Sequence, residues 1–353
     1  MAEWGDGGSG RLLPHSFRNL ESARARNLED EQAKHRKTAA AMTSVPRVTI
    51  ITPFLNAASN LGEAIASVRA QTIADWELLL VDDNSTDDSI RIANDAAAID
   101  PRIKVLRRPP GSKRGAAAAR NAGIAASCGD LLAFLDADDL YEPHMLQTVL
   151  AAADANPDAA MIFGPTKWWY PDGARSDWVE PTDGLAARLH QPPRLLGRLL
   201  LMQDGHVPCT CSVLLRRSAV GTVGGFEEHF ELYEDQALWA KLFLRFPAFI
   251  TPVTLARYRQ HSSSASAIAT QRGLYDRMGK HPARAAFLDW IAEHMMESGT
   301  RDFRLQLALR LARAPYVTPA TIGSKAERLA LKIMMWTAKQ RRRIRRQLAH
   351  VAR

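Results

Sequence analysis

LLAFLDADDLYEP, residues 131–143, places three acidic side chains directly behind a short apolar run. The apolar residues predict a buried strand, and Asp136, Asp138 and Asp139 follow at its carboxyl end. One interpretation is a helix N-terminus, in which Asp138 or Asp139 caps free N–H groups and Pro143 takes an early helical position. Capping does not explain three acids within four residues, because their charges repel one another unless a cation is present. Mg²⁺ and Mn²⁺ bind carboxylate oxygens together with substrate phosphates, so the stretch favours a divalent metal site.

Apolar runs alternate with helical stretches on the N-terminal side of this segment. Each run has the uninterrupted, β-branched character of a strand that is buried on both faces. The predicted strands are 48–52, 76–83, 102–106 and 130–136, and the predicted helices between them are 61–72, 85–99 and 115–128. Ser85 or Thr86 is expected to cap the second helix. Successive βαβ units predict an α/β fold with a Rossmann-like, doubly wound, mostly parallel sheet.

The chain continues with shorter strands and a helical end. Residues 161–178 predict a strand and a hairpin that turns at Pro171, Asp172 and Gly173. A further strand (211–217), a helix (233–246) and a last strand (254–261) follow, and beyond about residue 270 the pattern is helical and basic. We therefore expect a mobile polar leader (1–45), an α/β domain (46–268) and a helical basic C-terminal extension (269–353).

The ends of two predicted strands carry acids that belong to one crevice. Ligands of doubly wound sheets bind beyond the carboxyl ends of the strands, where VDDNS (81–85) and DADD (136–139) both lie. The alternative for VDDNSTDDS alone is an Asx-rich turn that begins a helix. Taken together, the two stretches predict a nucleotide pocket. In it, Asp83 would accept a hydrogen bond from a pyrimidine N–H, and Asp136 would contact the ribose or a metal-bound water.

The charge of the chain is concentrated at its C-terminus. The formal net charge is +8, but the last 15 residues, KQRRRIRRQLAHVAR, contain seven Lys or Arg and no acid. The rest of the chain has 39 basic and 38 acidic residues and is close to neutral. We therefore do not expect nucleic acid as a partner.

The cysteines and the N-terminus indicate a reducing compartment. Cys128, Cys209 and Cys211 lack the paired spacing of a structural zinc site or a disulfide framework. We interpret Cys209 and Cys211 as incidental buried thiols, with redox or metal chemistry as the alternative. The N-terminus has no apolar core of signal-peptide type, and no run of about 18 apolar residues occurs, so a cytoplasmic location is expected.

Four segments of the chain, in this order, resemble the motifs of family-2 glycosyltransferases, which are inverting enzymes of the GT-A fold. They are TIITPFLNAASNLGEAIASVRAQTIADWELLLVDDNSTDDS (49–89), ARNAGIAASCGDLLAFLDADDLYEP (119–143), VGGFEEHFELYEDQALWAKL (223–242) and YRQHSSSAS (258–266). The resemblance covers about residues 47 to 265, and the combination is far more specific than any one motif. It makes residues 46–268 the expected catalytic domain.

The resemblance implies a set of donor-binding residues for a nucleotide sugar. Those expected at the base, the ribose and the donor phosphates are Pro53, Asn56, Asp83, Arg120 and Asp136. The alternative is that Arg120 only takes part in the packing of an Ala-rich helix. Many members of the family have an aromatic residue where this chain has Leu55, so a base is not expected to stack there.

The resemblance also implies a metal site for Mn²⁺ or Mg²⁺ and a catalytic base. Asp138 is expected as the direct metal ligand, and His261 is expected to complete the metal or diphosphate site unless its role is structural. Asp235 of the Glu234-Asp235 pair matches the base that deprotonates the acceptor hydroxyl. The alternative for this pair is a charged helix N-terminus.

The expected acceptor is a glycan or a lipid-linked molecule, and the acceptor side is expected in residues 164–210. Aromatic side chains suit sugar faces, although a packing layer explains them equally well. The aromatic residues in this region are Trp168, Trp169, Tyr170 and Trp178.

Two other functions fit parts of the sequence. One is a non-catalytic nucleotide-sugar-binding protein on the same fold, although the presence of both Asp138 and Asp235 speaks against it. The other is a haloacid-dehalogenase-like phosphatase, which also ends an apolar strand with D-x-D. In such phosphatases the motif follows the first strand, whereas here two βαβ units precede it.

The basic tail predicts contact with a membrane surface. Residues 327–353 place an apolar cluster, including Met334, Met335 and Trp336, before six cations in the eight residues from Lys339 to Arg346. An interfacial helix of this composition would bind anionic lipid headgroups and make the protein a peripheral membrane protein. The alternative is a helix that packs on the catalytic domain and ends in a solvated basic stretch.

Overall fold

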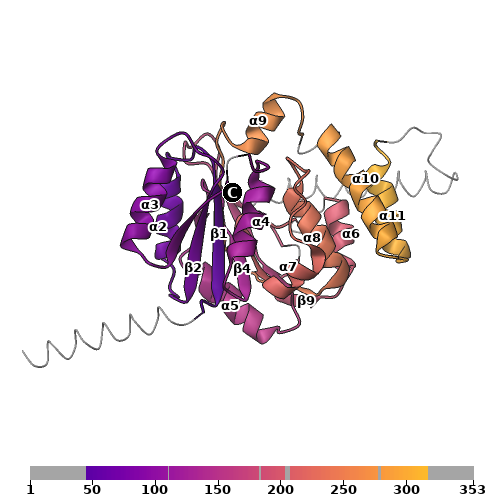
Figure 1. The fold of residues 1–353 in the computed structure, drawn as a ribbon. Coiled ribbons are helices and arrows are strands. Elements are labelled where there is room, and N and C mark those ends of the chain that lie inside the picture. Colours follow the sequence, from indigo (N-terminus) through magenta and orange to yellow (C-terminus); the bar gives the residue numbers. More distant parts are fainter. Residues whose placement is uncertain (1–44, 110, 183, 203–206, 277–279, 317–353) are drawn as a thin grey trace, which may run out of the picture. The chain divides into compact units, whose positions relative to one another are not determined.

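The computed structural model describes residues 45–316 except 110, 183, 203–206 and 277–279 (Figure 1). An eight-stranded sheet has the order β3-β2-β1-β4-β10-β6-β11-β9. Its first half consists of the parallel strands β1 (Val48–Phe54), β2 (Trp76–Asp82), β3 (Ile103–Arg107) and β4 (Leu131–Phe134). They are connected by α2 (Leu61–Arg69), α3 (Ser89–Ile99) and α4 (Ala116–Ala126). The prediction of an α/β fold with a mostly parallel sheet is confirmed.

Helices cover both faces of this sheet. Ile51 and Leu79 belong to one apolar cluster and their neighbours Ile50 and Leu78 to another, because successive side chains of a strand point to opposite faces. The first cluster includes residues of α4, α6 (Arg194–Leu200), α7 (Arg217–Val223) and α8 (Glu234–Arg245). The second includes residues of α2, α3 and α5 (Met145–Ala155). Apolar side chains on both faces explain why these strands have no alternating polar pattern.

The second half of the sheet mixes strand directions, which the sequence did not predict. It contains β6 (Met161–Phe163), β9 (Arg188–His190), β10 (Val213–Arg216) and β11 (Ala248–Ile250). β10 is antiparallel to both β4 and β6. The beginning of β10, not its end, therefore lies at the carboxyl end of β4. The preceding 3₁₀ turn η1 (Thr210–Ser212) is brought to the same edge of the sheet.

A smaller sheet with the order β5-β12-β7-β8 carries further residues of the site. Its strands are β5 (Leu140–Tyr141), β7 (Thr166–Trp169), β8 (Trp178–Val179) and β12 (Ala256–Arg259). β7 and β8 form the predicted hairpin, and Gly173 in its turn has φ +69°, a conformation that glycine adopts without strain.

One predicted helix start is wrong, and the helix-capping alternative for the acids after β4 is excluded. The N-cap of α3 is Asp88 rather than Ser85 or Thr86. The acids after β4 cap no helix, because β5 follows them and α5 begins at Met145 with His144 as its N-cap. The acidic side chains are therefore available for contacts with other parts of the chain.

Three helices follow β12: α9 (Ala265–Gln271), α10 (Pro282–Glu297) and α11 (Phe303–Arg313). Phe287 of α10 and Leu305 of α11 are buried in the same cluster as α6 and α8, and Figure 1 shows α10 and α11 on the side of α6 and α8. No helix within the described ranges is long and apolar enough to cross a membrane. Residues 1–44 of the predicted leader lie outside the described residues, as does the whole basic tail (327–353).

Candidate active site

A cavity of about 1090 Å³ opens beyond the carboxyl ends of β1, β2 and β4. All eight residues predicted for the site line it, although they come from six separate segments of the chain. They are Pro53, Asn56, Asp83, Arg120, Asp136, Asp138, Asp235 and His261. The expectation that the acids behind β2 and β4 share one crevice is thus confirmed.

The carboxylates of the acidic loop behind β4 differ in their surroundings: one is buried and hydrogen-bonded, and two are partly exposed. Asp139 is buried, and its Oδ1 accepts a hydrogen bond of 2.9 Å from the backbone N–H of Arg259 in β12. Burial raises the pKa of Asp139 well above its usual range, and the charges of Asp138 and Asp136 add to this. Asp136 and Asp138 keep about 30% of their side chains exposed toward the cavity. Asp139 therefore joins β12 to the loop, while the other two acids face the ligand space.

His261 pairs with Asp138 at the cavity wall. Its Nε2 lies 2.8 Å from Asp138 Oδ2, and its Nδ1 lies 2.8 Å from Ser263 Oγ. Arg259 also holds Asp138 in place, because its Nε donates a hydrogen bond to the backbone oxygen of Asp138 at 2.7 Å. Asp139 and Arg259 thus both fix the end of β12, from which His261 extends.

The Asp138–His261 pair has the donor atoms of a divalent metal site that is completed by a ligand. No group of three or more His, Cys, Asp or Glu side chains suited to a metal exists among the residues with described positions. Mg²⁺ and Mn²⁺ are often bound by one or two side chains plus substrate phosphates and water. One carboxylate and one imidazole, both partly exposed to the cavity, fit that arrangement.

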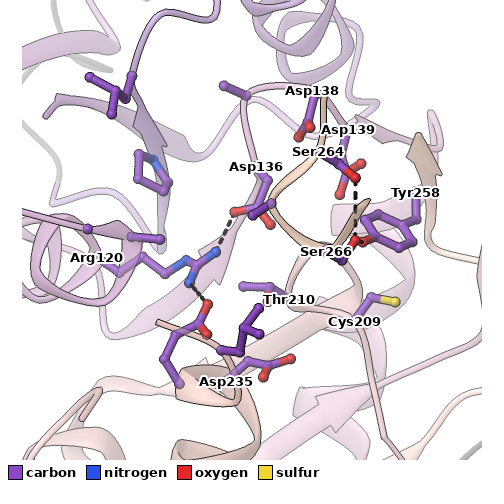
Figure 2. Close-up of a pocket in the computed structure, with 18 of the residues that line it drawn as sticks. Arg120, Asp136, Asp138, Asp139, Cys209, Thr210, Asp235, Tyr258, Ser264 and Ser266 are labelled. Carbon is purple, nitrogen blue, oxygen red and sulfur yellow. Dashed lines mark hydrogen bonds and ion pairs between the residues drawn. The ribbon is translucent and has the colours of Figure 1, made fainter. Parts of the chain in front are cut away.

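Arg120 joins the acidic loop to the start of α8. Its guanidinium is buried and donates to Asp136 Oδ1 at 2.6 Å and to Glu234 Oε1 at 2.9 Å (Figure 2). Burial alone would lower the pKa of Arg120, but the two carboxylates outweigh it and raise that pKa, so the side chain stays charged. The predicted alternative of mere helix packing is incomplete, because the ion pairs connect segments 114 positions apart.

Asp83 is held by a residue that the sequence analysis missed. Its Oδ1 forms an ion pair with the buried guanidinium of Arg108, and its Oδ2 accepts a hydrogen bond of 2.8 Å from the backbone N–H of Gly115. Arg108 follows β3, so the carboxyl-end rule that identified Asp83 could also have identified Arg108.

Pro53 lies near the end of β1, and Asn56 lies in the loop behind it. β4 pairs with β1 only as far as Ile51, so the missing N–H of Pro53 leaves no gap in that ladder. Asn56 has φ +50°, and its Oδ1 accepts a hydrogen bond of 2.8 Å from the backbone N–H of Thr86. Asn56 therefore fastens the loop behind β2 to the loop behind β1.

Asp235 begins α8 at another part of the cavity wall. Its Oδ1 accepts a hydrogen bond of 2.6 Å from the backbone N–H of Gln236. Burial in the wall, together with the neighbouring carboxylate of Glu234, raises the pKa of Asp235 to about 7. In Figure 2 Asp138 and Asp235 lie well apart, with Asp136 between them.

Aromatic and sulfur-containing side chains line a further part of the cavity. Trp168 stacks on Trp178 with ring centroids 5.2 Å apart, and the edge of Tyr258 meets Trp168 at 4.9 Å. Trp168, Tyr258 and Cys209 face the cavity. Burial raises the pKa of both the Cys209 and the Cys211 thiols well above its usual range, in agreement with unreactive thiols.

The sequence is similar to those of several known proteins. A protein described as O-antigen biosynthesis protein RfbC of Myxococcus xanthus is 31% identical over 262 residues, which are 72% of this chain and 18% of that protein. Putative glycosyltransferase EpsE of Bacillus subtilis is 28% identical over 205 residues, which are 57% of this chain and 68% of that protein. The chain thus spans less than a fifth of the length of the first relative.

A solved structure of S. aureus TarS 1–349 in complex with UDP-GlcNAc superposes with a TM-score of 0.49 at 16% identity, covering 76% of this chain and 80% of that one. Residues 49–224, about half of the chain, match the family model described as glycosyl transferase family 2. Through these residues the chain belongs to glycosyl transferase family 2.

Proposed function

We propose that the protein is an inverting glycosyltransferase that moves a sugar from a nucleotide-diphosphate sugar to an acceptor hydroxyl with the help of Mn²⁺ or Mg²⁺. The observation that carries the proposal is a cavity that holds an Asp–His pair and, apart from it, a carboxyl group with a raised pKa. Family membership agrees with it, and a relative described as an O-antigen biosynthesis protein supports a role in cell-surface polysaccharide or glycolipid synthesis.

The donor nucleotide would lie across the ends of β1, β2 and β4. Pro53, Asn56 and Asp83 would line the base, and Asp136 would contact the ribose. Both oxygens of Asp83 already accept one hydrogen bond or ion pair, but each has a second lone pair for a base N–H. Arg120 would hold Asp136 in place and contribute a fixed positive charge to a cavity wall rich in acids.

Asp138 and His261 would hold the metal. A bound divalent cation stabilises the negative charge that develops on the departing diphosphate. The neutral form of His261 binds a cation, and Ser263 next to its Nδ1 fixes the ring orientation. The two side chains would need to move little to bind one cation, because His261 Nε2 and Asp138 Oδ2 are already in contact.

Asp235 would act as the general base. As the acceptor oxygen bonds to the anomeric carbon, the bond from that carbon to the diphosphate oxygen breaks, and the hydroxyl proton passes to Asp235. A carboxyl group with an ordinary pKa near 4 is a weak base, whereas a pKa of about 7 matches proton transfer at neutral pH. A single displacement from the side opposite the leaving group inverts the configuration of the sugar.

The acceptor would enter beside the aromatic wall that contains Trp168 and Tyr258. A glycan or the sugar end of a lipid-linked acceptor would suit such a wall. We further propose that residues 46–268 form the catalytic domain and residues 269–353 its extension, and that the protein works in the cytoplasm at the inner face of the membrane.

A nucleotide-sugar screen tests the proposal. Purified protein is incubated with Mn²⁺ and a panel of nucleotide sugars, and release of the nucleoside diphosphate is measured with and without candidate glycan acceptors. We expect release from one donor class that requires the metal and is lost in Asp235→Asn. Calorimetric donor binding without any release under these conditions would instead favour the non-catalytic alternative.

A further inference from the structure

The chain turns sharply just before the Glu234-Asp235 pair. Tyr233 has φ +75°, a left-handed backbone conformation that is unfavourable for a bulky aromatic residue. The backbone oxygen of Tyr233 accepts the first hydrogen bond of α8, from the backbone N–H of Ala237 at 2.8 Å. No side chain caps this helix. The direction in which Asp235 enters the cavity therefore depends on whatever holds Tyr233 in this conformation.

Helix α10 holds the Tyr233 side chain from two directions. The Tyr233 hydroxyl lies 3.1 Å from His281 Nε2, and the Tyr233 ring stacks with the rings of His281 and Phe287, at centroid distances of 5.7 Å and 5.2 Å. The guanidinium of Arg284 lies 5.6 Å from the centre of the same ring. Tyr233, His281 and Arg284 are each no more than 5% exposed.

The hydrogen bonds define how these groups interact. His281 Nδ1 accepts a hydrogen bond from the backbone N–H of Arg284, as the N-cap of α10, so the neutral ring carries its proton on Nε2. That Nε2–H donates to the Tyr233 oxygen. Burial and the charge of Arg284 lower the pKa of His281, which keeps the ring neutral.

Arg284 also connects α10 with the segment behind α6. Its Nη2 donates to the carbonyl oxygen of Leu200, the last residue of α6, at 2.5 Å. Met202, Val207 and Pro208, which follow α6, line the cavity. Arg284 has no carboxylate partner among the described residues, and its Nη1 is buried without a hydrogen-bond partner there. An unpaired buried cation is unfavourable for stability alone, which points to a functional reason for it.

We propose that α10 is part of the catalytic apparatus, because His281 and Arg284 fix the left-handed turn at Tyr233 and thereby position Asp235 for proton transfer. This inference rests on the proposed function, in which Asp235 is the base. His281 and Arg284 are positioning residues that touch no substrate. They make the helical C-terminal part necessary for turnover and not for donor binding, since the donor residues lie on other segments.

Three substitutions separate this role from general stability. Tyr233→Phe removes only the hydroxyl and keeps the stacked ring. His281→Asn preserves an N-cap for α10 but is too short to reach Tyr233. Arg284→Met removes the cation and leaves no carboxylate unpaired among the described residues, so it does not create a buried uncompensated charge. Asp289→Asn serves as the control, because Asp289 also lies on α10 but forms only a surface ion pair with Arg313 of α11.

We expect the three variants to lower kcat by roughly 10-fold to 100-fold, the range for a slightly misplaced catalytic group, with donor affinity in Mn²⁺ within about 2-fold of wild type. In the pH profile of kcat/KM, the pH below which activity falls is expected to be lower than in the wild type, because a loosened wall admits water to Asp235 and weakens the desolvation that raises its pKa. Asp289→Asn should change neither quantity.

Wild-type kcat in Tyr233→Phe and His281→Asn, with Asp235→Asn inactive, would overturn this inference alone. An equal loss of kcat and donor affinity in all three would show a purely structural role and overturn it too. Full activity of Asp235→Asn would instead overturn the proposed function itself.

Discussion

His261 Nε2 lies 2.8 Å from Asp138 Oδ2, which joins the loop behind β4 to the end of β12 across 123 positions of sequence. Each side chain alone has an ordinary structural explanation. Their contact at the wall of a cavity lined by further acids is the basis of the metal site that we propose.

Asp138→Asn should therefore abolish the dependence of donor binding on Mn²⁺. Loss of a residue that merely orients a metal ligand costs about 10-fold to 100-fold in metal affinity, so loss of the ligand itself should exceed about 100-fold. Calorimetric titration of the donor, with and without Mn²⁺, measures the effect. Asp130→Asn is the matched control, because Asp130 is 93% exposed and pairs only weakly with Arg217 at 3.4 Å. Unchanged donor affinity of Asp138→Asn in Mn²⁺ would contradict the assignment.

Asp235→Asn should retain donor binding and lose transfer. The amide keeps the size of the side chain but cannot accept a proton, and a positioned general base contributes roughly 10²–10⁴ to the rate. Steady-state transfer to a defined acceptor and donor titration are measured on the same preparation. Turnover close to that of the wild type would show that Asp235 is not the base.

The pH dependence of kcat/KM should report the raised pKa of Asp235 in the free enzyme. The deprotonated carboxylate is the active form, so kcat/KM should be constant above the pKa and should fall about tenfold per pH unit below it. With a pKa of about 7, the decline should begin near neutrality, well above the range of an ordinary carboxyl group. A profile of log kcat/KM from pH 5 to 9 checks this, and a flat profile down to pH 5 would exclude the assignment.

Arg120→Met should destabilise the fold. It removes the buried cation between Asp136 and Glu234 and leaves two partly buried carboxylates without their partner. Loss of one partner of a buried pair costs about 3 kcal/mol at the lower end of the range, which applies here because both acids are partly exposed. Urea unfolding measures the change. Arg91→Met is a matched control, since Arg91 also pairs with two acids but is 62% exposed, and its unfolding midpoint should equal that of the wild type.

The sequence predicts the first half of the fold well because its signals are local. β1 and β2 are mainly apolar strands of seven residues, and the acids behind β2 and β4 meet because carboxyl ends of parallel strands share one edge. The direction of β10 is not predictable in this way, because an apolar strand of four residues pairs equally well in both directions.

Local sequence patterns also could not predict the contacts that distant segments make in the site. The Arg120–Glu234 pair spans 114 positions, and its existence depends on how α4 packs against α8. Asp139 was expected to bind metal or cap a helix, yet it accepts a hydrogen bond from the backbone of β12. Three acids within four residues look alike in sequence, and only the position of β12 shows which of them supports the loop and which face the cavity.

The last prediction concerns the basic tail, residues 327–353, all of which lie outside the described residues. Its six cations between Lys339 and Arg346 follow an apolar cluster, and each Lys or Arg near an anionic surface contributes about 1 kcal/mol. Truncation after residue 327 should therefore reduce co-sedimentation with vesicles that contain anionic lipid. High salt should have the same effect on the full-length chain, because it screens the attraction. Vesicles of zwitterionic lipid alone are the control and should bind both chains weakly. Equal sedimentation of the two chains with anionic vesicles at low salt would contradict this prediction and favour a helix that packs on the protein. The active site would then have to reach a lipid-linked acceptor without this membrane anchor.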